Sequence, residues 1–247
     1  MNETYELKYH RIEEKYWWFI ARRDMIFRLI KHLNIRKNSK ILDIGCSGGR
    51  LIKCLGLKGF RNIYGIDISQ KAINLCKKNG MKNVFIMDCA KTNFSNETFD
   101  IIIASDILEH IKNDASALAE WGRIMKPGGK LIIFVPASDL LWSEHDELSH
   151  HYRRYTKSQL ITALKKFNFN VLKSSYWNCS LFFPMVIFKS LQHIFLKKKN
   201  KKSDHLYELN IIISKMLLIL LKFENSALEY LNFPFGTSIF ALAVKTK

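Results

Sequence analysis

From residue 40 onward, short apolar runs alternate with amphipathic stretches of helical spacing. Five runs have the continuous apolar character of buried strands, at residues 41–44, 62–68, 83–87, 99–104 and 130–135. Helical stretches lie between them at residues 50–57, 70–79 and 116–125, and Lys126-Pro-Gly-Gly is expected to stop the last helix and turn the chain. This alternation predicts an α/β protein with a doubly wound parallel sheet.

The regions that flank these strands differ from them. Residues 1–34 contain no Gly or Pro and carry apolar positions at helical spacing, which predicts one or two helices before the sheet. Residues 169–177 and 238–245 are two further strand candidates, with a long apolar and basic stretch between them. We therefore expect a helical cap at residues 1–37, a sheet domain at residues 38–178 with 236–247, and a helical insert at residues 179–235.

The first strand ends in a glycine cluster, Gly45, Gly48 and Gly49, which opens the helix expected from Arg50. Small residues let a ligand approach the backbone, and the free N–H groups of a helix start attract anions, so the turn can cradle a nucleotide. The dinucleotide motif G-x-G-x-x-G fails here at Ser47 and Arg50, and the chain has no G-x-x-x-x-G-K-[ST] loop. A nucleotide other than NAD is therefore expected.

Polar residues follow the next strands, at Asp67, Asp88, Ser105 and Asp106. Carboxyl ends of parallel strands share one edge of a sheet, so these side chains are expected to surround the ligand. Asp67 has the separation from the glycine turn that suits a carboxylate bound to ribose hydroxyls. The alternative for such an acid is a helix N-cap, a position that Asp favours.

The stretch from Lys40 to Arg50, KILDIGCSGGR, resembles the glycine motif of class I S-adenosylmethionine-dependent methyltransferases, roughly [VIL]-[LV]-D-[IVL]-G-C-G-x-G. Asp43, Gly45, Cys46 and Gly49 match it, and Ser47 replaces a usual glycine. The resemblance continues through FDIIIASDILEHI at residues 99–111 and through residues 118–131. With these stretches the chain is identified as a member of that superfamily, of methyltransferase type 11, over most of residues 10–178.

This resemblance implies S-adenosylmethionine as the cofactor and a Rossmann-like seven-stranded sheet in the order 3-2-1-4-5-7-6, with helices on both faces and a reversed edge hairpin. By position, the glycine turn would pack against the methionine part, Asp67 would hold the ribose, Asp88 the adenine amino group, and Ser105 would lie beside the sulfonium. The implied cofactor-binding residues are Asp43, Gly45, Cys46, Ser47, Gly49, Asp67, Ile68, Asp88, Cys89 and Ser105.

A narrower resemblance covers residues 141–156, LWSEHDELSHHYRRYT, which is similar to L-W-S-x-x-D-x-x-x-G-H-x-R-R-Y-T in a subgroup associated with lipid, glycan and secondary-metabolite pathways. His150 replaces the glycine of that pattern. Two interpretations stay open: the segment forms part of the acceptor pocket, or Asp146, His151 and Arg154 form a network that fixes the loop. The predicted substrate-binding residues are Trp17, Arg22, Arg154 and Tyr155.

Methyl transfer to a hydroxyl or an amine releases a proton, and histidine can accept one near neutral pH. His110 and His151 are the candidate catalytic bases; alternatively, His110 only orients the helix that follows it. Adjacent Trp17 and Trp18 are not expected to point into the same core, so one of them would face a ligand or a lid. In the alternative interpretation both pack within their own domain.

The chain carries 39 basic and 22 acidic residues, a formal charge of +17, which favours an acidic partner such as an anionic membrane or nucleic acid. Two apolar stretches of the insert flank the run Lys197-Lys-Lys-Asn-Lys-Lys, a combination typical of a membrane-surface element. A solvated basic loop with a helical lid, or a subunit contact, is the alternative. The sequence contains no uninterrupted run of 18 apolar residues, so a membrane-spanning helix is not predicted.

Five scattered cysteines without a C-x-x-C pair argue against a zinc site or disulfides, so no metal is expected and a cytoplasmic setting is favoured. The start of the chain lacks signal-peptide features. The sequence therefore predicts methyl transfer to a small, lipid-linked or hydrophobic acceptor at the cytoplasmic membrane face. The alternatives are an RNA methyltransferase, whose Asn/Asp-Pro-Pro-aromatic signature is absent here, and a non-catalytic cofactor-binding scaffold. The oligomeric state is not predicted.

Overall fold

A computed structural model describes residues 12–33, 35–195 and 209–246 of the chain. Seven strands form one sheet in the order β3-β2-β1-β4-β5-β7-β6. Strands β1 to β5 are parallel, and β7 lies antiparallel between β5 and β6. Their bounds are Lys40–Ile44, Asn62–Asp67, Val84–Ile86, Phe99–Ser105, Met125–Pro136, Phe169–Trp177 and Ser238–Lys245 for β1 to β7. The predicted sheet and its reversed edge hairpin are confirmed.

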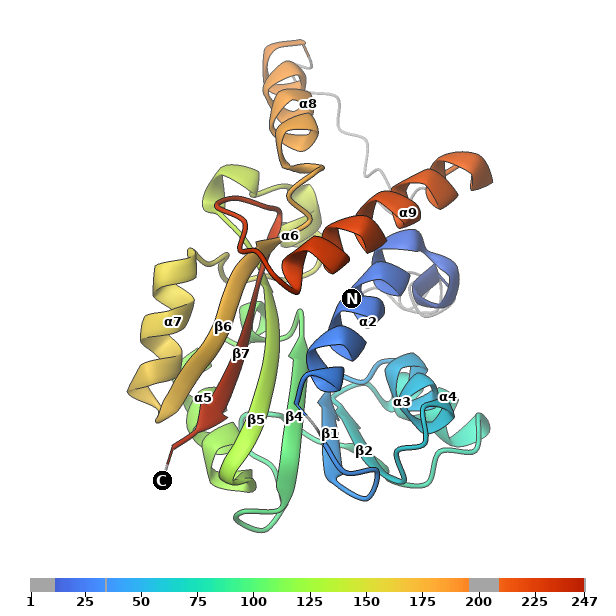
Figure 1. Cartoon of the computed structure of the whole chain (residues 1–247), viewed down its shortest axis with the longest axis vertical. Helices are drawn as coiled ribbons and strands as arrows, with labels where there is room; N and C mark the ends of the chain where they lie inside the picture. Colours follow the sequence, from blue (N-terminus) through green and yellow to red (C-terminus); the bar gives the residue numbers. More distant parts are fainter. Residues whose placement is uncertain (1–11, 34, 196–208, 247) are drawn as a thin grey trace.

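Helices cover both faces of this sheet (Figure 1). On one face α5 and α7 pack over the apolar side chains of β1, β4, β5 and β7, and on the other α2, α3 and α9 pack over the alternate side chains of the same strands. The helix bounds are Trp17–Lys31 (α2), Arg50–Leu57 (α3), Gln70–Lys78 (α4), Asp114–Ile124 (α5), Glu144–Leu148 (α6), Lys157–Lys166 (α7), Phe182–Phe195 (α8) and Ile211–Leu228 (α9). Short 3-10 turns occupy Leu108–His110 (η1) and Asp139–Leu141 (η2).

Polar side chains cap the N-termini of three helices. The hydroxyl of Ser69 accepts a hydrogen bond from the Ala72 N–H and caps α4. Asn113 caps α5 in the same way, and Thr156 with Gln159 forms a capping box at α7. The N-cap of the helix that follows β2 is therefore Ser69 and not Asp67. The side chain of Asp67 remains available for other contacts.

The structure confirms the helix stop predicted at Lys126-Pro-Gly-Gly but corrects the turn. Helix α5 ends at Ile124, and β5 already begins at Met125, which pairs with Phe99 of β4. The register then shifts before Ile101, and the extra residues of β5 are accommodated by this irregularity, with Gly128 at φ +75°. The segment is therefore an irregular start of a strand and not a loop between two elements.

The two adjacent tryptophans also depart from expectation. Trp17 is 8% exposed within the core beneath α2, and Trp18 packs against the same core with its ring 5.4 Å from that of Trp177. Both fit because Trp17 and Trp18 contact one continuous core, in which α2, α9 and one face of the sheet meet. The expectation that the two rings face different surroundings was wrong.

The insert between β6 and β7 contributes helices α8 and α9. Within the described part of the chain, no helix has the length and apolar character needed to cross a membrane. The run Lys197–Lys202 lies outside the described residues. The proposed division into cap, sheet domain and insert stays a prediction.

Candidate functional site

The glycine turn after β1 is held tightly against β2. The N–H groups of Gly45 and Cys46 both donate to the carbonyl of Ile66, at 2.8 and 3.0 Å. Gly49 has φ +78°, and a Cβ there would lie 2.3 Å from the sulfur of Met81. A side chain at Gly49 is therefore disfavoured by the backbone conformation, and it would have to displace the end of the Met81 side chain. The turn keeps its backbone open to a ligand.

Ser47, which replaces a usual glycine, has the left-handed backbone of a glycine, with φ +48°. Its N–H donates to Asp67 at 2.9 Å, and its hydroxyl donates to the carboxylate of Glu13 at 2.7 Å. A non-glycine residue in this conformation costs about 1 kcal/mol, and the two hydrogen bonds offset this cost. Sequence reasoning missed Glu13, because its helical spacing carries no sign of a partner in the glycine turn.

Residues 12–15 are helical and lie over this turn. Buried Arg23 of α2 fixes them by donating to the backbone carbonyls of Glu13 and Glu14, at 3.1 and 3.3 Å. Arg50, the first residue of α3, forms an ion pair with Glu14 at 2.8 Å. The segment before α2 is thus attached to the glycine turn at two places.

Asp67, at the end of β2, joins the turn to α4. Its Oδ2 accepts from the Ser47 N–H and its Oδ1 from the Ser69 N–H, each at 2.9 Å. A carboxylate oxygen has two lone pairs, so both oxygens keep capacity for ribose hydroxyls. The next residue, Ile68, is 79% exposed, which is unusual for a large apolar side chain and leaves it open to a flat ring.

Asp43 is buried in β1 beneath the turn. Burial raises the pKa of this carboxyl well above its ordinary value, and the nearby Glu13 carboxylate and Asp67 raise it further. Acidic groups thus meet under and over one short loop. This environment favours a cation, such as the ammonium group of the methionine part of S-adenosylmethionine.

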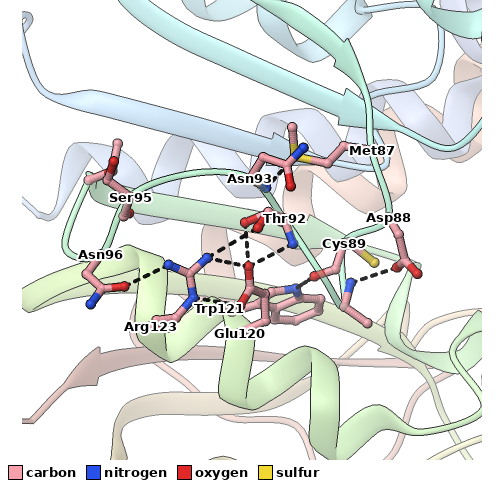
Figure 2. A network of polar contacts seen from close by, with 12 residues as sticks. Met87, Asp88, Cys89, Thr92, Asn93, Ser95, Asn96, Glu120, Trp121 and Arg123 are labelled. Atoms are coloured by element: carbon pink, nitrogen blue, oxygen red, sulfur yellow. Dashed lines mark hydrogen bonds and ion pairs between the residues drawn. The ribbon is translucent and has the colours of Figure 1, made fainter.

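The loop after β3 carries Asp88 and Cys89 and is anchored to α5 (Figure 2). The Trp121 indole donates to the carbonyl of Cys89 at 3.0 Å, and Asp88 accepts from the Ala90 N–H at 2.8 Å. Burial raises the pKa of the Cys89 thiol to about 12, so it stays protonated. Asp88 itself is exposed, which places an acceptor at the rim of the site.

Glu120 is the centre of that anchor. Its Oε1 accepts from the N–H and the hydroxyl of Thr92, at 2.8 and 2.5 Å, and Arg123 donates to both carboxylate oxygens, at 2.7 and 2.8 Å. Arg123 also binds the side chain of Asn96 at 2.7 Å. The loop is therefore fixed at both of its ends (Figure 2).

At the end of β4 the Ser105 hydroxyl donates to Asp106 at 2.9 Å, and Asp106 forms an ion pair with Arg22 at 3.5 Å. Arg22 is 2% exposed, and its guanidinium lies 4.2 Å from the ring centres of Phe134 and Trp177. Its predicted contact with the substrate stays a prediction. Arg22 links α2 to the carboxyl end of the sheet.

The polar segment of residues 141–156 forms the predicted network. Asp146 is fully buried and accepts from His151 Nδ1 at 2.8 Å and from two nitrogens of Arg154 at 2.9 Å each. Burial alone would raise the pKa of Asp146, but the hydrogen bonds from His151 and Arg154 hold it well below its ordinary value. His150 has φ +57°, which explains why the subgroup pattern has glycine there.

Tyr155 is also directed inward. It is 5% exposed and donates from its hydroxyl to Asp114 at 2.8 Å, and Arg153 pairs with the same carboxylate at 2.8 Å. Arg154 and Tyr155 therefore fix the segment against α5 and β5. Their predicted substrate contacts stay untested, and Trp17 is buried in the core.

His110 and His151, far apart in the sequence, lie with ring centres 4.5 Å apart at 84°. His110 is an exposed residue, but the protein around its ring and the neighbouring His151 lower its pKa to about 4. The carboxylate of Glu109, which is fully buried, lies within 4.8 Å of a ring nitrogen of each histidine. The two predicted catalytic residues therefore meet directly after β4, and their role as bases stays a prediction.

A family model described as "Methyltransferase domain" matches residues 42–133. An uncharacterized protein of Methanocaldococcus jannaschii is 34% identical over 173 residues, 69% of this chain and 70% of that relative. The ubiquinone biosynthesis O-methyltransferase of Hahella chejuensis is 29% identical over 98 residues, 37% of this chain and 41% of the relative. The match thus spans less than half of the length of that enzyme.

Two solved structures are similar in fold. A SAM-dependent methyltransferase from Archaeoglobus fulgidus has a TM-score of 0.60 at 18% identity, over 96% of this chain and 99% of that one. Phosphoethanolamine N-methyltransferase 2 from Haemonchus contortus, in complex with S-adenosyl-L-methionine, has a TM-score of 0.57 at 20% identity, over 90% of this chain and 52% of that one. At these identities the similarity concerns the fold.

Proposed function

The chain belongs to the class I methyltransferases that use S-adenosylmethionine as cofactor, and we propose that it methylates a small, hydrophobic or lipid-linked acceptor at an anionic membrane surface. One observation supports both the class of acceptor and the membrane surface. Helices α8 and α9 expose large apolar side chains at the edge of the sheet where the predicted cofactor-binding residues lie.

The edge follows from the strand register. Trp177, the last residue of β6, and Ser238, the first of β7, pair with each other, and Ser238 also pairs with Pro136 at the end of β5. The insert therefore leaves and rejoins the sheet at the carboxyl ends of the parallel strands. Figure 1 shows α8 and α9 extending from that end, opposite to the C-terminus of the chain. An acceptor held by these helices would lie near the methyl donor.

One face of α9 is apolar and open to solvent. The exposed fractions are 68% for Ile211, 65% for Ile212, 65% for Met216, 68% for Ile219 and 75% for Phe223. At 100° per residue these side chains share one side of the helix. The other side holds buried residues that pack on α2, such as Leu221 and Leu228.

Helix α8 adds further exposed apolar side chains, with fractions of 54% for Phe183, 38% for Met185, 58% for Ile187 and 61% for Phe188. By the same helical geometry, Lys215 and Lys222 lie on this side of α9, between the directions of Ile211 and Ile219. Apolar bulk next to lysines suits a helix that lies in the headgroup region. Each lysine near an anionic surface contributes about 1 kcal/mol, and the sequence places the run Lys197–Lys202 between the two helices.

The chemistry in this proposal is an in-line displacement. The acceptor atom forms a bond to the methyl carbon, the carbon–sulfur bond breaks, and the sulfonium becomes a neutral thioether. Asp67, Asp88 and the glycine turn would hold the cofactor, so the protein contributes mainly alignment and exclusion of water. A hydroxyl or amine acceptor also loses a proton, on the side of the site where His110 and His151 lie.

The acceptor class is tested by incubating the full chain with methyl-labelled cofactor and separate total lipid, glycan and RNA fractions. We expect the label in the lipid fraction. Label in RNA alone would support the RNA methyltransferase alternative, and calorimetric binding of the cofactor without label in any fraction would support a non-catalytic scaffold. Both of the latter results would contradict the proposal.

The membrane surface is tested by co-sedimentation with vesicles that contain anionic lipid at low salt. We expect wild-type protein to bind, and the double variant Ile219→Glu with Phe223→Glu to lose binding. Leu57→Glu is the matched control, since Leu57 is 81% exposed but lies at the end of α3 and outside the insert. Equal binding by the double variant and this control would contradict a role of α9.

A further inference from the structure

Glu109 carries a carboxyl group that is enclosed by the protein. Its side chain is 0% exposed, and within the described part of the chain neither carboxylate oxygen has a hydrogen-bond partner. Buried carboxyl groups are normally hydrogen-bonded or paired, because loss of solvation disfavours both the ionised and the unpaired state. A native group of this kind indicates that something else contacts it.

Two imidazole groups lie close enough to Glu109 to bind the same ion. One donor atom each from Glu109, His110 and His151 lie within 4.8 Å of one another. Metal–ligand distances of about 2.0–2.2 Å place the ligand atoms roughly 3.5 Å apart. Small side-chain rotations would therefore bring all three onto one ion.

Both imidazoles are already oriented by a partner at one nitrogen. His151 Nδ1 lies 2.8 Å from Asp146 Oδ1, which leaves Nε2 as the acceptor nitrogen. The ring of His110 is hydrogen-bonded to the backbone of Ser149. Metal-binding histidines almost always have such a second contact to a carboxylate or a carbonyl, which fixes the tautomer and the ring plane.

We propose that Glu109, His110 and His151 form a binding site for a divalent transition-metal cation at the end of β4. Two imidazole nitrogens and one carboxylate oxygen suit zinc, iron, nickel or manganese. Three protein ligands also leave a coordination position open for an oxygen atom of a small molecule. The scattered cysteines and the chain spacing of the three residues gave no sign of this site in the sequence.

The role of the cation rests on the proposed methyl transfer, whereas its binding does not. Glu109 lies four residues after Ser105, so a hydroxyl bound at the open position would be close to the methyl donor. The bound hydroxyl would lose its proton to solvent, its oxygen would bond to the methyl carbon, and the carbon–sulfur bond would break. Ligation uses the nitrogen lone pairs that a general base needs, so the cation and the base role of these histidines exclude each other.

The test is calorimetric titration of EDTA-treated, dialysed full-length protein with Zn²⁺, Mn²⁺ and Mg²⁺, without any acceptor. We expect one Zn²⁺ per chain, bound at least tenfold more tightly than Mn²⁺ or Mg²⁺. Glu109→Gln and His110→Ala should each weaken Zn²⁺ binding by at least tenfold. Asp146→Asn, which perturbs the hydrogen bond that orients His151 and the ion pair with Arg154 but removes no proposed ligand, should weaken it by about 10–100-fold.

His150→Gly is the matched control. It removes the neighbouring imidazole, suits the positive φ of that position, and should leave Zn²⁺ affinity unchanged. Absence of stoichiometric binding by the wild type would overturn the proposal. Unchanged affinity in folded His110→Ala and Glu109→Gln would overturn it too, as would a loss in the control as large as in these variants. Because no acceptor is present, failure of the proposed methyl acceptor would leave these results intact.

Discussion

Glu120→Ala should loosen the loop that carries Asp88 and Cys89. Glu120 is the acceptor for both polar groups of Thr92 and for two nitrogens of Arg123, and it comes from α5, which is fixed in the core (Figure 2). The substitution removes all four hydrogen bonds while leaving the strands untouched. The effect should therefore be confined to this loop and to the part of the site that is predicted to hold the adenine.

The expected loss of unfolding free energy follows from how exposed the two partners of Glu120, Arg123 and Thr92, are to solvent. The side chain of Arg123 is 36% exposed, so its ion pair with Glu120 contributes at most about 1 kcal/mol. Thr92 is 8% exposed, and leaving its N–H unpaired costs about 1–3 kcal/mol. We expect a loss of about 3 kcal/mol of unfolding free energy, which lowers the Tm of a chain of this size by about 6–12 °C.

The assay is thermal unfolding by circular dichroism, with calorimetric titration of S-adenosylmethionine on the same samples. Cofactor affinity should fall about tenfold, because binding must then order the loosened loop at a free-energy cost of about 1.4 kcal/mol. Lys91→Ala is the control, because Lys91 is an exposed residue of the same loop. An unchanged Tm and an unchanged affinity in Glu120→Ala would refute the argument that α5 orders the loop.

The same variant has a defined pH dependence. Burial would raise the pKa of Glu120, but the hydrogen bonds from Arg123 and Thr92 lower it below its ordinary value of 4.5. The stabilisation is therefore complete above pH 4.5 and is lost as the pH falls through the lowered pKa. The Tm difference between wild type and Glu120→Ala should shrink in that range; a constant difference down to pH 3 would contradict this assignment.

Three further perturbations have defined outcomes. Asp67→Ala should weaken cofactor binding at least about tenfold by calorimetry, since the contact with the turn and the predicted contact with the ribose are both lost. Gly49→Ala should lower the unfolding free energy by about 1–3 kcal/mol in urea titrations, from positive φ and crowding. Hydrogen bonds from His32 and Arg28 lower the pKa of Glu229 from 4.5, so this link between α9 and α2 should weaken below pH 4.5 in near-UV circular dichroism. Glu229→Gln should abolish that transition; its persistence would contradict the assignment.

The order of the elements was determined by the sequence, because its signals are local. A buried strand shows a continuous apolar run within a few residues, and the glycine turn and capping residues act on their immediate neighbours. The same holds for the two departures from the family patterns, Ser47 and His150. Each stands where glycine is usual, and each has positive φ in the structure.

The contacts of the site were decided by the tertiary structure. Glu13 meets Ser47, and His110 meets His151, only because the sheet brings residues from distant segments to one edge. Burial likewise depends on neighbours: the sequence does not distinguish the enclosed carboxyl of Glu109 from the exposed one of Asp88. On α9 the helical period is local, but which side is covered depends on where α2 packs. Local chemistry fixes the elements, whereas solvation and partners depend on how distant segments meet.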